Sequence, residues 1–79
     1  QNIMDNPATD KWKDMLTLLL SKEKWEREEI ENRCKKMGLM LGAVLEQIND
    51  YAYDKVDDGV VEDDGEYLYV TLDYKEKLI

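Results

Sequence analysis

Apolar residues recur at helical spacing near the start of the chain. Thr9 or Asp10 can cap a helix, and the apolar positions that follow lie three or four residues apart. These positions are Trp12, Met15, Leu16 and Leu19. The spacing predicts a first helix over about residues 10–20.

A second helical stretch follows Ser21, which is the next candidate cap. Its apolar stripe would consist of Trp25 (or its neighbouring turn), Ile30, Cys34 and Met37, the last three at helical spacing, and Gly38 follows Lys35-Lys36-Met37. A glycine just beyond a last turn that carries cations is typical of a helix end, where the chain turns into a left-handed conformation. The pattern predicts a second helix over about residues 22–36.

The clearest helical period in the chain lies in its middle. It predicts a third helix over about residues 40–55, and Asp57-Asp58-Gly59 would end it. The apolar stripe of this helix consists of Leu41, Val44, Leu45, Ile48, Tyr51, Ala52 and Val56.

Two short runs of β-forming residues then flank an Asp-Gly pair, which predicts a hairpin. With Asp64-Gly65 as a two-residue loop, Val61 lies opposite Leu68 and Val70 shares their face, whereas Glu62, Tyr67 and Tyr69 face the other way. This register places Asp63 opposite Glu66, a repulsive pair that a wider loop or a bound cation would relieve. Asp73 is a candidate cap for a short helix over residues 74–79.

Helix, helix, glycine turn, helix and hairpin form the order of a winged helix. We therefore predict an α+β fold, mostly α, with three helices plus a β-hairpin wing. Residues 1–8 are predicted to be a linker or disordered lead, and residues 9–79 a single winged-helix-like domain. The predicted core is Trp12, Leu16, Leu19, Trp25, Ile30, Cys34, Leu41, Leu45, Ile48, Ala52, Val61, Leu68 and Val70.

The net charge of −8 comes entirely from residues 46–66, where nine acids face Lys55 alone. That stretch covers the end of the third helix and the hairpin, the parts that a winged helix offers to DNA, and a phosphate backbone would be repelled there. The bases of the second helix alternate with glutamates and suit pairs four residues apart, Glu29 with Arg33 and Glu31 with Lys35. DNA binding is therefore the least favoured function.

Composition also argues against catalysis. The chain has no histidine, the commonest general base and metal ligand, and its one cysteine, Cys34, falls on an apolar stripe. We predict no enzyme activity and no cofactor. A single cysteine fits a reducing cytoplasm, and the longest apolar run, over residues 37–45, is too short to cross a bilayer. We expect a cytoplasmic chain with no direct membrane contact.

Metal binding by the acidic loop is the alternative function, with the module acting as a divalent-cation sensor. Calcium prefers several carboxylate oxygens on a glycine-containing loop. The EF-hand pattern fails, however, because a loop that starts at Asp54 has Val56 at its third position and Gly65 where the pattern needs glutamate. We therefore assign no metal ligands.

From Ser21 onward, the sequence resembles the TerB-C domain. The resemblance is carried, in order, by residues 25–30 (WEREEI), 38–43 (GLMLGA), 45–54 (LEQINDYAYD) and 69–72 (YVTL). It implies a non-catalytic, cytoplasmic, bacterial module at the C-terminus of larger TerB-type proteins of the tellurite-resistance and stress-response group. The acidic metal site of the TerB domain proper is not visible in this chain.

The remaining candidate site is a tyrosine-rich surface beside the acids. Tyr53 falls off the apolar stripe of the third helix, and Tyr67 and Tyr69 share the outer hairpin face. Tyrosine supplies both contact area and a hydroxyl, which suits a protein interface. We predict that these tyrosines, with Asp57, Asp58, Asp63 and Asp64, bind a protein with a basic surface, in cis or in trans, and not nucleic acid.

Overall fold

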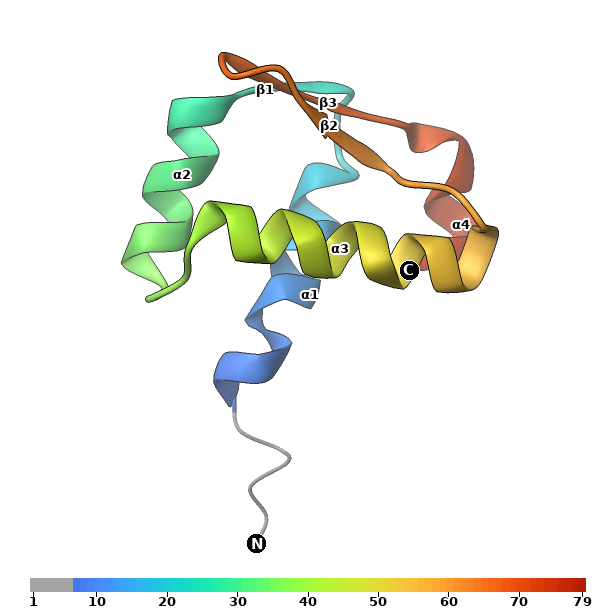
Figure 1. Ribbon diagram of the computed structural model, residues 1–79, viewed down its shortest axis with the longest axis horizontal. Helices are drawn as coiled ribbons and strands as arrows, with labels where there is room; N and C mark the ends of the chain where they lie inside the picture. Colours follow the sequence, from blue (N-terminus) through green and yellow to red (C-terminus); the bar gives the residue numbers. More distant parts are fainter. Residues whose placement is uncertain (1–6) are drawn as a thin grey trace, which may run out of the picture.

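The computed structural model describes residues 7–79, in which a small sheet covers one side of a helical layer (Figure 1). The predicted α+β, mostly α, class is confirmed, as are the three helices and the hairpin. The order is α1 (Pro7–Leu19), β1 (Lys24–Glu26), α2 (Arg27–Lys36), α3 (Leu41–Val56), β2 (Val61–Asp63), β3 (Tyr67–Val70), the 3₁₀ turn η2 (Leu72–Tyr74) and α4 (Lys75–Leu78).

The beginning of α1 differs from the expected one. The helix begins at Pro7, a residue whose fixed φ suits the first helical position. The linker predicted for residues 1–8 lies outside the described residues, except for Pro7 and Ala8, which belong to α1.

The prediction of a helix from residue 22 is wrong, because Lys24–Glu26 form strand β1. This strand pairs antiparallel with β3, and Trp25 lies opposite Leu68 in a sheet of order β1-β3-β2. The Trp25 side chain is buried, and its Nε1 donates a hydrogen bond of 3.1 Å to the carbonyl oxygen of Leu19. Trp25 thus fixes the sheet to the end of α1.

The glycine turn between α2 and α3 is confirmed. Gly38 has a φ of +76°, and its N–H donates to the carbonyl of Lys35 at 3.1 Å. The next N–H, of Leu39, donates to the carbonyl of Cys34 at 2.8 Å. These two bonds form a Schellman motif, which satisfies carbonyls at the end of α2 and redirects the chain into α3.

The predicted hairpin register is wrong by one loop residue, because the two central residues are Gly65 and Glu66. The N–H of Asp64 donates to the carbonyl of Tyr67 at 3.1 Å, and Val61 lies opposite Val70 instead of Leu68. Asp63 lies opposite Leu68, so the expected Asp63–Glu66 pair does not form. Moving the loop by one residue moves the pairing by two, and each side chain therefore keeps its predicted face.

The core lies between the sheet and the helices. Every predicted core residue is buried except Trp12, which is half-buried and makes an edge contact with Tyr51, with ring centroids 5.4 Å apart. The core also includes five residues beyond the predicted set: Met15, Leu20, Val44, Val60 and Leu78.

The C-terminal segment returns to α3. Asp73 lies inside η2 and does not cap the final helix with its side chain, contrary to the prediction, and α4 begins at Lys75. Leu78 is buried, and its carbonyl accepts a hydrogen bond of 3.4 Å from the Tyr51 hydroxyl. The end of the described chain is thus packed into the domain.

Candidate functional site

The outer face of the sheet carries two rows of polar and aromatic side chains. Since residues paired across strands share a face, Lys24, Tyr69 and Glu62 form one row. Glu26, Tyr67 and Asp64 form the other row. In Figure 1 the helices of the described chain lie on the opposite side of the sheet. We call these six residues the tyrosine face.

The two tyrosines of this face are neighbours and share a cation. Their ring centroids are 6.4 Å apart, and the Lys24 ammonium lies 4.1 Å from the centroid of Tyr67 and 5.7 Å from that of Tyr69. Tyr69 is 39% exposed, and Tyr67 is half-buried. Partial burial, followed by the charge of Asp64, raises the pKa of the Tyr69 hydroxyl. The tyrosine face therefore presents aromatic rings that already contact the ammonium of Lys24.

Tyr53 lies on α3 and is 57% exposed. It does not join the tyrosine face, but it lines a shallow cleft between α3 and the edge of β2, together with Tyr69. Gly59 lies at one end of the cleft, where an added Cβ would be in ordinary van der Waals contact with the Tyr53 ring, at 3.5 Å. The structure therefore brings Tyr53 and Tyr69 to one cleft, while Tyr67 lies outside it.

The floor of this cleft contains an arrangement that the sequence did not indicate. Asn49 of α3 accepts hydrogen bonds from the N–H groups of Val60 (2.8 Å) and Val61 (3.0 Å), and it donates one of 2.9 Å to the Val61 carbonyl. The N–H and C=O of Val61 point away from β3, so the amide of Asn49 takes the place of a neighbouring strand. The only feature of the sequence that marks Asn49 is its position directly after Ile48, beside the apolar stripe of α3.

Two of the predicted acids end α3. Asp57 adopts a left-handed conformation with φ of 60°, which aspartate tolerates better than most residues, and its N–H donates to the Tyr53 carbonyl at 3.0 Å. Asp58 accepts a hydrogen bond of 2.9 Å from the Tyr74 hydroxyl. That bond, with the Asp58 charge, raises the pKa of Tyr74.

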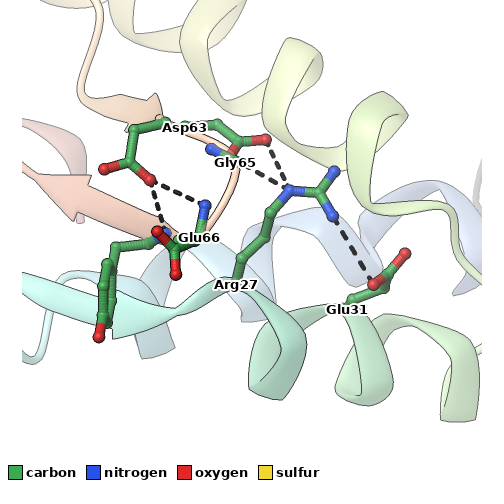
Figure 2. Close-up of polar contacts among 7 residues, drawn as sticks. Arg27, Glu31, Asp63, Gly65 and Glu66 are labelled. Carbon is green, nitrogen blue, oxygen red and sulfur yellow. Dashed lines mark hydrogen bonds and ion pairs between the residues drawn. The ribbon is translucent and has the colours of Figure 1, made fainter.

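The other two acids hold the tip of the hairpin (Figure 2). Arg27 donates from Nε to the carboxylate of Asp63 at 3.0 Å, and its backbone N–H donates to the Glu66 carbonyl at 2.9 Å. The carboxylate of Asp64 accepts the N–H groups of Glu66 and Tyr67 at 2.8 and 2.7 Å. These two backbone bonds lower the pKa of Asp64. Asp63 and Asp64 thus have structural partners.

The expected ion pairs of α2 are only partly present. Glu29 pairs with Arg33 at 3.8 Å, as predicted. Glu31 pairs with Arg27 at 3.6 Å, as drawn in Figure 2, and not with Lys35. Arg27 is preferred because the start of α2 places it between Glu31 and the hairpin tip. Its role was missed in the sequence because β1 was missed.

Other chemistry finds little support in the described part of the chain. No group of three or more Cys, Asp or Glu side chains within it is placed to hold a metal ion. Cys34 is fully buried, and burial raises the pKa of its thiol, which keeps it protonated at neutral pH. Among the described helices, none has the length and apolar character needed to span a bilayer.

The fold and this surface define a small α+β module with an acidic, tyrosine-bearing sheet. The family model of the TerB-C domain matches residues 9–79, and the chain belongs to the TerB-C domain family. The resemblance is thereby confirmed and extends to α1. The family associates the module with tellurite resistance. No curated protein and no solved structure matches the chain.

Proposed function

We propose that this chain is a non-catalytic docking module that binds a protein through its tyrosine face, within a larger bacterial stress-response protein or in trans. The carrying observation is that the outer face of the sheet exposes Tyr69 and part of Tyr67, while the described helices pack on the other side (Figure 1). Aromatic rings with hydroxyl groups are enriched at the centres of protein interfaces.

Charge supports a basic partner. The stretch 46–66 carries the whole net charge of −8, and Glu62 and Asp64 of the tyrosine face belong to it. Such a field speeds the encounter with a basic surface and repels nucleic acid and anionic lipid. The single cysteine is consistent with action in the reducing cytoplasm.

The winged-helix-like order of elements makes this charge informative. A strand between the first two helices, a third helix and a hairpin are all present. In a winged helix, the third helix and the wing are the parts that usually approach DNA. Here the same parts are acidic, so we infer that the shape serves protein contact instead. Cation sensing by the loop has less support, because Asp58, Asp63 and Asp64 each bind groups of the protein itself.

A capture experiment tests the proposal. The chain is immobilised, captured proteins from the source organism are identified by mass spectrometry, and the affinity of the purified partner is then measured. We expect Tyr69→Ala and Glu62→Lys to weaken binding by about tenfold or more, as is typical of interface centres. Glu76→Lys is the matched control, since Glu76 is an exposed acid on α4. A partner that binds all of these variants equally well would refute the tyrosine face as the docking surface.

A further inference from the structure

The cleft between α3 and β2 has a composition suited to one kind of side chain. It is lined by Tyr53 of α3, by Asp58 and Glu62, and by Tyr69, with the residues around Val60 and Val61 at its floor. Its volume of about 390 Å³ lies near the lower end of the range for ligand pockets, roughly 300–1,000 Å³. A single long side chain fits such a space better than a large ligand.

Among the described residues, no lysine or arginine lines this cleft. The nearest basic residue along α3, Lys55, places its ammonium 5.6 Å from the ring of Tyr51, which faces the opposite side of the helix from Tyr53. Lys24 lies on the β1 side of the sheet, where its ammonium is 4.1 Å from the ring centroid of Tyr67 and 5.7 Å from that of Tyr69. Asp58, Glu62 and Tyr53 therefore meet in a cleft that no described lysine or arginine lines.

The other end of the hairpin provides a contrast within the same molecule. The cleft beside the hairpin tip also collects glutamates, but Arg27 lines it and donates to Asp63 at 3.0 Å. There the protein supplies its own guanidinium (Figure 2). The cleft between α3 and β2 has no such guanidinium among its described lining residues.

We propose that this cleft is a binding site for an arginine side chain presented by a basic, extended segment of the partner protein. This inference rests on the proposed docking function and names its recognition chemistry. The guanidinium stacks against Tyr53, which is 57% exposed, and donates to the carboxylate of Glu62. Glu62 is exposed, and the free oxygen of Asp58 is a second acceptor, because the other oxygen already binds Tyr74.

Arginine is favoured over lysine for geometric reasons. Its planar guanidinium stacks on aromatic faces and donates two parallel hydrogen bonds to a carboxylate, whereas an ammonium is a compact, strongly hydrated charge. A second copy of this chain is disfavoured as the occupant, since its own acidic stretch would face the acids of the cleft. Backbone pairing of the segment with the Val61 part of β2 is also disfavoured, because Asn49 already bonds the N–H and C=O of Val61 there.

Peptide titration tests this site directly. The probe is a blocked peptide in which arginine alternates with serine, and its counterpart of the same length contains lysine. Binding to the full chain is followed by NMR, with the amides of Val60, Val61 and Thr71 as reporters of the cleft. We expect saturable binding of the arginine peptide, about fivefold or more tighter than that of the lysine peptide.

The variants separate the cleft from general charge attraction. Tyr53→Ala and Glu62→Gln should each weaken the arginine peptide by about tenfold, whereas Tyr53→Phe, which keeps the ring, should bind like the parent chain. Glu76→Gln is the matched control, because it removes the same charge from an exposed position on α4, outside both the cleft and the tyrosine face. It should weaken binding by about twofold at most, as expected for a screened surface charge. Circular dichroism checks that each variant is folded.

Three outcomes would overturn the arginine site. These are equal losses for Glu62→Gln and Glu76→Gln with no effect of Tyr53→Ala, equal affinity for the two peptides, or no saturable binding of the arginine peptide. None of these outcomes refutes the docking proposal. That proposal fails only if the captured partner binds the Tyr69→Ala and Glu62→Lys variants as tightly as the parent chain. The two failures are therefore distinguishable.

Discussion

Asn49 is the side chain that joins α3 to the sheet. Its amide makes three hydrogen bonds to the backbone of Val60 and Val61. Such a residue contributes more than its size suggests, because its removal leaves partly buried backbone groups without partners. Amides that replace a strand neighbour are recognised only after the fold is known.

We expect Asn49→Ala to lower the free energy of unfolding by about 2 kcal/mol, the magnitude typical of unsatisfied buried polar groups. Urea denaturation measures the change. Gln47→Ala on the exposed side of the same helix is the control, and it should change stability by less than about 0.5 kcal/mol. A loss in Asn49→Ala no greater than in the control would show that water replaces the amide without penalty.

Asp64 gives the hairpin tip a dependence on pH. Its carboxylate accepts two backbone N–H groups, which hold its pKa below the ordinary value of 3.8. A carboxyl whose pKa is lowered by folding stabilises the fold above its unfolded pKa, and that contribution is lost as the pH falls toward the folded pKa.

Asp64→Asn therefore provides a test of this contribution, since asparagine can still accept hydrogen bonds but does not titrate. We expect the parent chain to be more stable than the variant at about pH 6, and the difference to shrink as the pH falls below about 4. Urea denaturation at several pH values measures it. A difference that stays constant over this range would mean that the pKa of Asp64 is the same in both states.

At the scale of elements, β1 shows where helical periodicity misleads. The helical spacing of Ile30, Cys34 and Met37 does not extend to Trp25, which lies five residues before Ile30, and a strand of three residues is too short to show its own alternation. Strand formation here depends on pairing with β3, more than forty positions away in the chain. A single-sequence pattern contains no information on that partner.

The hairpin register shows a similar limit. Asp-Gly at the centre of a loop favours a two-residue turn at those positions. The observed turn lies one residue later because the Asp64 carboxylate bonds the N–H groups of Glu66 and Tyr67. Alternation of apolar and polar residues nevertheless predicted the buried and exposed faces correctly, since a shift by two keeps each side chain on its face.

The turn between α2 and α3 allows a prediction with opposite signs at two glycines. Gly38 has a positive φ, so Gly38→Ala should destabilise the fold by about 1 kcal/mol, although no atom lies within 4 Å of the added methyl group. Gly42 lies in α3 and also has open space around it. Gly42→Ala should be neutral or stabilise by up to about 1 kcal/mol, because alanine favours helix.

Thermal unfolding of both glycine variants checks this pair. The expected result is a lower Tm for Gly38→Ala and an unchanged or higher Tm for Gly42→Ala. If both variants lost the same stability, backbone strain at Gly38 would not be the cause. The pair is informative because the two substitutions add the same methyl group in open space.

At the scale of the molecule, charge is unevenly distributed. Residues 46–66 carry the net charge of −8, while the remaining segments are balanced. This concentration was predicted from the sequence alone, as were the exposure of Tyr53 and the shared face of Tyr67 and Tyr69. The cleft that joins Tyr53 to Tyr69 was not, because it depends on how α3 crosses the edge of β2.

We expect this repulsion to make stability rise with salt. Raising sodium chloride from about 0.05 to 0.5 M should increase the Tm by roughly 2–5 °C, because the Debye length falls below the spacing of the acids. The double variant Glu46→Gln/Asp54→Asn, at exposed positions of α3, should gain less from the same salt. An equal gain in both chains would point to general salt effects on burial instead of repulsion.

The amide of Asn49 also bears on polymerisation. An unpaired strand edge is a template on which further chains can add as β-strands, and short, charged or covered edges prevent such growth. By bonding the outward N–H and C=O of Val61, Asn49 closes the β2 edge where its residues are apolar, and the acids that follow are left to repel a second chain. Deamidation of Asn49 to aspartate would remove the donor to the Val61 carbonyl, so we expect it to reopen the edge at this one group, while the new carboxylate still accepts the N–H groups of Val60 and Val61.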